Sequence, residues 1–254
     1  AWFIQQREDG YADRSVADIV REICSLSDGA TVSSKKDNLV NIGGFLALRD
    51  PDLARRARTM VVQFEGLHTY GGMSGRDMEA LARGIREMVE TDDHVRARVG
   101  QVEYLGRALA DGGVPIIQPV GGHGVFLDAM AVLPHISQDR FPAQALAAAL
   151  YLESGVRGME RGVVSAGRDK ETGDHHYPSL ELVRLTVPRR VYTQAHMDVT
   201  AESVIELLER PETVAGLRFT YEPEELRFFQ ARFEPVSVGT SARSEAPDAA
   251  AVPA

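Results

Sequence analysis

The chain is organised around Ser33-Ser34-Lys35-Lys36-Asp37-Asn38-Leu39-Val40-Asn41-Ile42-Gly43-Gly44. Its two lysines stand between apolar flanks, after two serines and before two glycines. A partly desolvated lysine beside a second ammonium has a lowered pKa, which frees its amine to attack a carbonyl. Serine hydroxyls can hydrogen-bond a phosphate. An imine-forming amine beside phosphate donors is the combination that pyridoxal phosphate requires. A solvated Lys-Lys turn between two strands is the alternative that this segment leaves open.

Further blocks continue along the chain from Ala1 to about Phe233. They are Phe64-Glu65-Gly66, Thr69-Tyr70-Gly71-Gly72, Gly121-Gly122-His123, Phe141-Pro142-Ala143-Gln144-Ala145-Leu146, Val183-Arg184-Leu185-Thr186 and Tyr221-Glu222-Pro223. Together with residues 33–37, they resemble the β-eliminating lyases, fold-type-I pyridoxal-phosphate enzymes that cleave tyrosine or tryptophan. The resemblance implies an α/β fold. Residues 1–105 would form the C-terminal part of a large cofactor domain with an interdomain helix, and residues 106–236 a small α+β domain.

Composition limits the classes of protein that the chain can belong to. Of its 254 residues, 44% are hydrophobic and 26% charged, as in one large or two small globular domains. The net charge of −9 disfavours a nucleic-acid partner because no basic stripe is present. The lone Cys24 fits a reducing compartment. Because no apolar run reaches the length of a membrane span and no leader opens the chain, we expect no membrane partner and a cytoplasmic location.

The chain begins at Ala1 without an initiator methionine. In the family that it resembles, several groups precede the position that matches Ala1. They are the aspartate on the cofactor's pyridine nitrogen, an arginine beside its phenolic oxygen, most of the phosphate-binding loop, the stacking aromatic and the tyrosine proposed as general acid. We therefore expect a C-terminal fragment with little or no lyase activity by itself.

Periodicity and turn residues predict the elements. We expect helices over 15–27, 53–60, 77–89, 95–109, 142–152 and 193–209, and a long loop over 63–76 that is either functional or a flexible connection. We expect strands on both sides of the lysines within 31–41, continued at 46–49, and over 114–118, 125–129, 156–166, 180–187, 217–221 and 226–233. Residues 237–254 lack aromatics and predict a disordered tail.

The resemblance assigns roles around the lysines. Lys36 matches the lysine that binds the cofactor covalently, and Lys35 a basic group near the cofactor phosphate and the cation site. Ser33 matches a phosphate ligand. Asn41 matches a residue whose main-chain carbonyl helps bind a monovalent cation, usually potassium, at a subunit boundary. The full-length protein would be a homotetramer. Without the resemblance, Asn41 is an ordinary strand residue.

Arg184 lies in an alternating segment that places Val183, Leu185 and Val187 on one face and Arg184 on the other. A charged residue there is usually the solvent face of a half-buried strand. In the family, the matching arginine binds the substrate carboxylate through its planar fork, which suits that task better than a lysine.

Two further differences within the family point to L-tyrosine as substrate. Arg161 matches the residue that contacts the phenolic ring, where tryptophan-cleaving members carry an apolar residue. Phe228 stands where those members carry histidine. Phe228 and Met159 would pack on the ring, although both could equally be core residues. His123 matches a supporting histidine near the site.

The resemblance thus implies β-elimination of L-tyrosine to phenol, pyruvate and ammonium, with Lys36 as the base for the α-proton. Three alternatives remain: cleavage of tryptophan, cleavage of another β-substituted amino acid such as cysteine, or a non-catalytic fragment that only associates with partner subunits.

Overall fold

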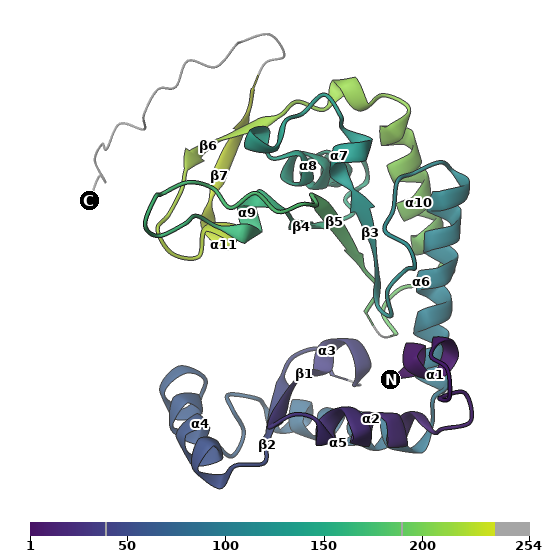
Figure 1. The fold of residues 1–254 in the computed structure, drawn as a ribbon, viewed down its shortest axis with the longest axis vertical. Coiled ribbons are helices and arrows are strands. Elements are labelled where there is room, and N and C mark those ends of the chain that lie inside the picture. The colour runs from purple at the N-terminus through teal and green to yellow at the C-terminus, as the bar shows by residue number, and fades with distance from the viewer. Residues whose placement is uncertain (39, 189, 237–254) are drawn as a thin grey trace. The chain divides into compact units, whose positions relative to one another are not determined.

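A computed structural model describes residues 1–38, 40–188 and 190–236, so the tail predicted for 237–254 lies outside the described residues. The fold is a mixed α/β arrangement with small sheets (Figure 1). The chain divides into two compact units. Unit 1 comprises Ala1–Phe126 and Leu185–Glu202, and unit 2 comprises Leu127–Arg184 and the residues from Ser203. The predicted domain boundary after residue 105 stays a prediction.

Unit 1 is mainly helical. It contains α1 (Trp2–Arg7), α2 (Val16–Ser25), β1 (Gly29–Ser33), α3 (Ser34–Asp37), β2 (Gly44–Leu48), α4 (Pro51–Phe64), α5 (Gly75–Glu90), α6 (Asp93–Asp111) and the first part of α10 (Gln194–Leu208). The predicted helices over 15–27, 77–89, 95–109 and 193–209 are confirmed. The helix predicted over 53–60 is longer, because α4 runs on to Phe64 and shortens the expected loop.

Local capping explains where these helices begin. The Ser15 hydroxyl accepts a hydrogen bond from the Asp18 amide at 3.1 Å and starts α2. An Asp50 carboxylate oxygen accepts from the amides of Asp52 (2.7 Å) and Leu53 (3.2 Å) and starts α4. In α6, apolar side chains at helical spacing form the centre of unit 1, namely Val99, Val102, Leu105 and Leu109, each at most 4% exposed.

The two lysines lie in a short helix, α3, which follows β1. The strand predicted before them is confirmed, but the strand predicted after them within 31–41 was wrong, because the second strand, β2, begins only at Gly44. Strands β1 and β2 pair antiparallel from Gly29↔Leu48 to Ser33↔Gly44, and α3 stands inside their connection. The Asn38 amide donates to the Ser34 carbonyl at 3.0 Å, which closes one helical turn. A Cβ at Gly44 would lie 2.3 Å from the Val32 carbonyl oxygen, so the close strand pairing requires glycine there.

Unit 2 contains shorter elements. They are α7 (Ala129–Val132), a 3₁₀ turn (Gln138–Arg140), α8 (Pro142–Ser154), β4 (Met159–Arg161), α9 (Val163–Ala166), a second 3₁₀ turn (Pro211–Thr213), β6 (Leu217–Tyr221), α11 (Arg227–Gln230) and β7 (Arg232–Pro235). Strands β3 (Gly124–Asp128) and β5 (Leu182–Thr186) lie where the two units divide. The sheet order is β3-β5-β4, and β6 pairs with β7.

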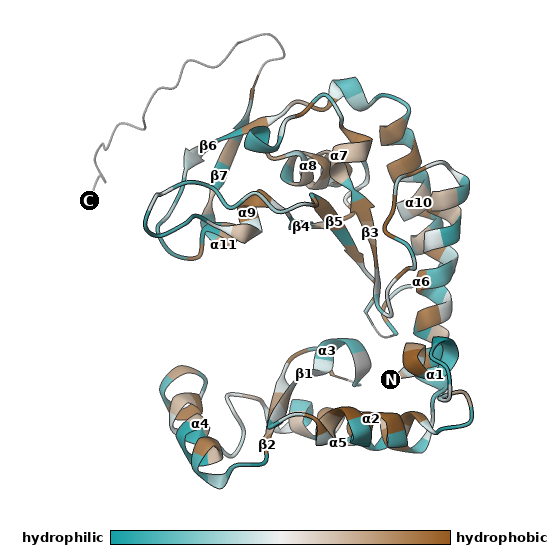
Figure 2. Cartoon of the chain, viewed as in Figure 1, coloured by the Kyte–Doolittle hydropathy of each residue, from teal (hydrophilic) through white to brown (hydrophobic). Residues whose placement is uncertain are grey.

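Alternating burial along β5 agrees with the sequence. Val183 and Leu185 are 0% and 4% exposed, and Val187 just after the strand is 1% exposed, whereas Arg184 is half-buried on the other face. Figure 2 shows the hydrophobic residues of β3 and β5 in brown. In unit 2, an aromatic cluster joins helix α8 to the β6–β7 pair. The rings of Phe141 and Phe219 have centroids 4.7 Å apart, and those of Phe219 and Phe233 are 4.6 Å apart.

Three of the predicted strands were wrong over part or all of their length. No strand forms over 114–118, where Pro115 has no amide donor and Pro119 follows directly. Of 156–166 only β4 is extended, because buried carboxylates bind the following amides and produce α9. Of 226–233 the first part is α11, where Arg227 donates hydrogen bonds to α9. Tertiary hydrogen bonds overrode the β pattern at both places.

Candidate functional site

Strand β1 and helix α3 position Lys36 in unit 1. Its side chain is half-buried, and its Nζ donates a hydrogen bond to the Ser33 Oγ at 3.1 Å. The structure therefore brings together the predicted cofactor lysine and the predicted phosphate ligand. Lys35 is exposed on the same turn, and Asn41 is exposed in the bend before β2. Adjacent side chains on a helical turn differ in direction by about 100°, so the two lysine side chains diverge.

Arg98 of α6 fixes the main chain of this turn. Its guanidinium is buried, with 8% of the residue exposed. Nη1 donates to the Lys36 carbonyl at 2.8 Å, and Nε donates to the Gly122 carbonyl at 2.9 Å. The neighbouring His123 is half-buried, and its carbonyl accepts from the Val187 amide at 2.8 Å. One guanidinium thus joins the lysine turn to the segment that carries His123.

Buried polar atoms lie on the inner side of the turn. Ser34 is 0% exposed, and its Oγ has no hydrogen-bond partner among the described residues. Asn38 is 3% exposed; its Nδ2 approaches the Met88 Sδ at 2.9 Å, and its Oδ1 has no partner within the described ranges. Burying such atoms without a partner costs free energy. The Ser34 hydroxyl, the Lys36 amine and the Ser33 hydroxyl supply donors that a phosphorylated aldehyde would use, whereas the Asn38 Oδ1 can only accept, so the lysine and the two serines fit pyridoxal phosphate.

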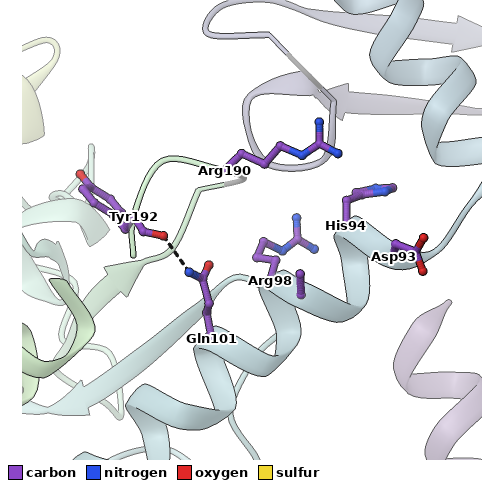
Figure 3. A pocket seen from close by; sticks show the side chains of 7 residues that line it. Asp93, His94, Arg98, Gln101, Arg190 and Tyr192 are labelled. Atoms are coloured by element: carbon purple, nitrogen blue, oxygen red, sulfur yellow. Dashed lines mark hydrogen bonds between the residues drawn. The ribbon is translucent and has the colours of Figure 1, made fainter. Parts of the chain in front are cut away.

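A cavity of about 340 Å³ opens beside α6 in unit 1, lined by Asp93, His94, Ala97, Arg98, Gln101, Arg190 and Tyr192. Figure 3 shows the side chains of successive α6 turns facing Arg190 and Tyr192. The Gln101 Nε2 donates to the Tyr192 carbonyl at 2.7 Å, and Arg190 pairs with Glu87. The Glu87 carboxylate balances the charge of Arg190, whereas Arg98 donates to two main-chain carbonyls, which do not neutralise it.

Strands β4 and β5 assemble the second set of predicted residues, in unit 2. Their antiparallel register pairs Met159 with Arg184 and Arg161 with Leu182, so these four side chains share one face. The Arg184 Nη2 approaches the Met159 Sδ at 2.8 Å, and its Nε has no partner in the described part of the chain. Burial lowers the pKa of Arg184, and the neighbouring Arg161 guanidinium lowers it further.

Phe228 of α11 completes this face. The guanidinium of Arg161 lies 5.7 Å from the centroid of the Phe228 ring, within the range of a cation–π contact. The structure therefore brings together Met159, Arg161, Arg184 and Phe228. Two cations beside an aromatic ring and a thioether can bind an anionic carboxylate and an aromatic ring. Of these residues, Arg161 is exposed and Met159 half-buried.

Sequence reasoning missed four charged residues behind these two sites. Arg98 could have been found, because it interrupts the apolar stripe of Val95, Val99 and Val102 on α6. The other three are Glu160, Glu181 and Arg227, each at most 8% exposed. Glu181 stands between two leucines, which weakly indicates a buried position. The sequence around Arg227 does not indicate burial of this residue, because the segment alternates like a strand.

Other kinds of site receive no support in the described ranges. No group of three or more His, Cys, Asp and Glu residues there could hold a metal ion. Cys24 is a free thiol. Among the helices that the structure describes, none has both the length and the apolar character needed to cross a membrane.

Comparison with known proteins identifies the class. The family model described as β-eliminating lyase matches residues 11–203, and the chain belongs to this family. It is 65% identical to a tyrosine phenol-lyase of Nostoc punctiforme over 234 residues, which cover 92% of this chain and 50% of the relative. It is 62% identical to a tyrosine phenol-lyase of Symbiobacterium sp. (strain SC-1), covering 93% of this chain and 52% of the relative. A tyrosine phenol-lyase of Clostridium tetani is 58% identical, covering 92% of this chain and 51% of the relative. The chain spans about half the length of these curated relatives.

Proposed function

We propose that the intact gene product containing this chain is a pyridoxal-phosphate-dependent lyase that cleaves L-tyrosine to phenol, pyruvate and ammonium. The observation that carries the proposal is the half-buried Lys36 amine 3.1 Å from the Ser33 hydroxyl, in a chain of the β-eliminating lyase family. The names of its relatives, which are 56–65% identical, support tyrosine as the substrate.

Lys36 would hold the cofactor through its Nζ, and Ser33 and Lys35 would contact the phosphate. When bound, the cofactor supplies an electron sink for the negative charge that develops at the substrate's α-carbon. The Lys36 amine would take the α-proton, a task that requires an amine whose pKa lies near the working pH. Arg98 would keep the main chain of Lys36 in place during this transfer, because it donates a hydrogen bond to the Lys36 carbonyl.

The β4–β5 face would bind the substrate. The half-buried Arg184 would bind the α-carboxylate through its fork. Arg161 would lie near the phenolic oxygen, where a cation stabilises the charge that develops as phenol leaves. Phe228 and Met159 would pack on the ring. His123 would have a supporting role near the cofactor.

Coarser features of the assembly belong to the same proposal. We propose the fold-type-I domain division after residue 105, a potassium ion bound in part by the main-chain carbonyl of Asn41, and a cytoplasmic homotetramer. Exposed apolar side chains of unit 1, such as Phe45 (41%), Leu46 (49%) and Phe64 (73%), support burial against a further surface. By itself, this chain would show little or no lyase activity, because family groups that contact the cofactor match positions outside it.

Borohydride trapping tests the role of Lys36. The chain has only three lysines, Lys35, Lys36 and Lys170, so peptide mapping can distinguish them. The intact gene product, loaded with pyridoxal phosphate and reduced, should carry the label at Lys36, and Lys36→Ala should abolish it while Lys170→Ala does not. Label at another lysine, or none, would overturn the cofactor assignment. Release of indole from tryptophan faster than phenol from tyrosine would overturn the substrate, and a tyrosine-dependent pyruvate signal from the isolated chain would contradict its expected inactivity.

A further inference from the structure

Two buried carboxylates lie behind the face that carries Arg161. Glu160 is 3% exposed and Glu181 is 0% exposed. The Glu160 carboxylate accepts hydrogen bonds from the main-chain amides of Gly162 (2.6 Å), Val164 (3.1 Å) and Ser165 (3.0 Å). The Glu181 carboxylate accepts from the Val163 amide at 2.9 Å. Each amide from residue 162 to residue 165 therefore ends on one of the two carboxylates.

Arg227 binds the other end of the same short helix. Its Nε donates to the Val164 carbonyl at 3.1 Å, and its Nη2 donates to the Val163 carbonyl. The residue is 8% exposed, so both bonds lie away from water. Its Nη1 donates to the Glu222 carboxylate at 2.9 Å, and the guanidinium lies 5.2 Å from the centroid of the Phe219 ring. Helix α9 is thus held by anions at its amides and by a cation at its carbonyls.

The residues that hold α9 are chain neighbours of the residues proposed to bind the substrate ring. Glu160 precedes Arg161 and follows Met159, and Arg227 precedes Phe228. We infer that Glu160, Glu181 and Arg227 are positioning residues that lock α9 and thereby set Arg161 against Phe228 for an aromatic ring. This inference rests on the proposed function, because it concerns the specificity of the same site.

The free energy needed to break these hydrogen bonds explains why α9 is held rigidly. Charge-assisted hydrogen bonds in a water-excluded region are stronger than neutral ones, and stripping a buried charge of its partners is expensive. A shift of α9 would break the bonds of all three charged groups together, so the element has one well-defined position. Arg161 is exposed and Phe228 is half-buried, so their separation depends on the buried elements that carry them.

Equilibrium binding of phenol and L-alanine separates positioning from a general loss of structure. Phenol probes the ring site, and L-alanine probes the carboxylate site at Arg184. In the intact gene product loaded with pyridoxal phosphate, Arg227→Lys should weaken phenol binding by about tenfold or more while L-alanine binding stays within about twofold. Glu160→Gln, which keeps the shape of the side chain, should show the same selective loss.

Arg168→Lys is the matched control. Arg168 also pairs with Glu222, at 2.7 Å, but its Nη1 donates to the Gly173 carbonyl and not to α9. This variant should leave the affinity for phenol unchanged. In the unaltered protein, saturating phenol should slow hydrogen exchange of the amides of residues 162–165, a measurement that does not depend on the variants folding.

The outcomes divide as follows. Equal losses for phenol and L-alanine in both α9 variants, or a phenol loss in Arg168→Lys as large as in Arg227→Lys, would overturn the inference. Unchanged amide exchange with phenol bound would also overturn it. An unaltered protein that binds neither phenol nor L-tyrosine would overturn the proposed function and this inference with it, whereas the preceding outcomes leave the proposed function standing.

Discussion

The guanidinium of Arg98 donates a 2.8 Å hydrogen bond to the main-chain carbonyl of Lys36, a residue 62 positions earlier in the chain. The same guanidinium donates to the Gly122 carbonyl at 2.9 Å. A lysine that must move its side chain during a reaction still needs a fixed backbone, and this contact holds the backbone without touching the amine. Arg98 therefore connects the packing of α6 to the chemistry proposed for the lysine.

We expect Arg98→Met to destabilise unit 1 by about 2–4 kcal/mol, because two buried carbonyls lose a charged donor. Urea unfolding of the chain measures this loss. The variant should also speed acylation of Lys36 by a water-soluble reagent, since the turn that carries it loosens.

Arg96→Met is the control for Arg98, because Arg96 is exposed on the same helix. It should change the free energy of unfolding by less than about 0.5 kcal/mol. Equal changes in the free energy of unfolding for the two substitutions would show that the hydrogen bond from Arg98 to the Lys36 carbonyl does not stabilise unit 1.

Gly162→Ala should destabilise unit 2 by about 3 kcal/mol, because there is no room for a methyl group. A Cβ at Gly162 would lie 2.0 Å from a carboxylate oxygen of the buried Glu181. Thermal unfolding measures the loss. Gly100→Ala in α6 meets nothing within 4 Å and should stabilise by up to about 1 kcal/mol through helix propensity. A stable Gly162→Ala variant would mean that Glu181 can move away at little cost.

Much of the fold follows from local signals in the sequence, and the failures share one cause. Ser15 and Asp50 cap the helices that they predict, and Val183 and Leu185 are buried as their alternation requires. The segment after Glu160 and the segment at Arg227 alternate like strands but form α9 and α11. Their conformation depends on hydrogen bonds that buried charged side chains make, and those between Arg227 and α9 join residues 63 and 64 positions apart, which a local pattern does not encode.

The residues of the candidate site could be predicted from the sequence, but the buried charged residues behind them could not. The resemblance placed Lys36 and Ser33 in one segment, and the structure brings their side chains into contact. It also placed Met159, Arg161, Arg184 and Phe228 in three separate segments that the β4–β5 register and α11 bring together. The charged residues behind that face escaped prediction because a buried ion is recognised only by its partners.

Lowering the pH should weaken unit 2 through His175. Burial, followed by the nearby guanidiniums of Arg168 and Arg227, lowers the pKa of this imidazole from 6.5 to about 4. Its Nδ1 lies 3.0 Å from the Arg227 Nη1, a contact in which the neutral ring accepts. Below pH 6.5 this histidine binds a proton in the unfolded chain but stays neutral in the folded chain. The contribution of His175 to the free energy of unfolding is therefore full above pH 6.5 and is lost as the pH falls toward about 4.

The measurement is the free energy of unfolding of the unaltered chain minus that of His175→Asn, followed from pH 7.5 down to about pH 4. The difference should fall by about 1 kcal/mol, a value discounted for solvent screening of a half-buried ring. Using a difference removes the opposing effect of Glu160 and Glu181, whose pKa values burial raises.

Arg184→Met should weaken the binding of a substrate carboxylate without lowering the stability of the protein. In the intact gene product loaded with pyridoxal phosphate, the variant should lose L-alanine affinity by at least about tenfold, because a carboxylate loses its only proposed guanidinium partner. Phenol affinity should stay within about twofold. The free energy of unfolding should change by less than about 1 kcal/mol or rise, since the Arg184 Nε has no partner among the described residues and Arg161 repels it. Arg218→Met, on the exposed surface of β6, should change neither affinity. If Arg184→Met instead lost stability and kept L-alanine affinity, Arg184 would be a structural residue, and the carboxylate would have to bind elsewhere on the protein.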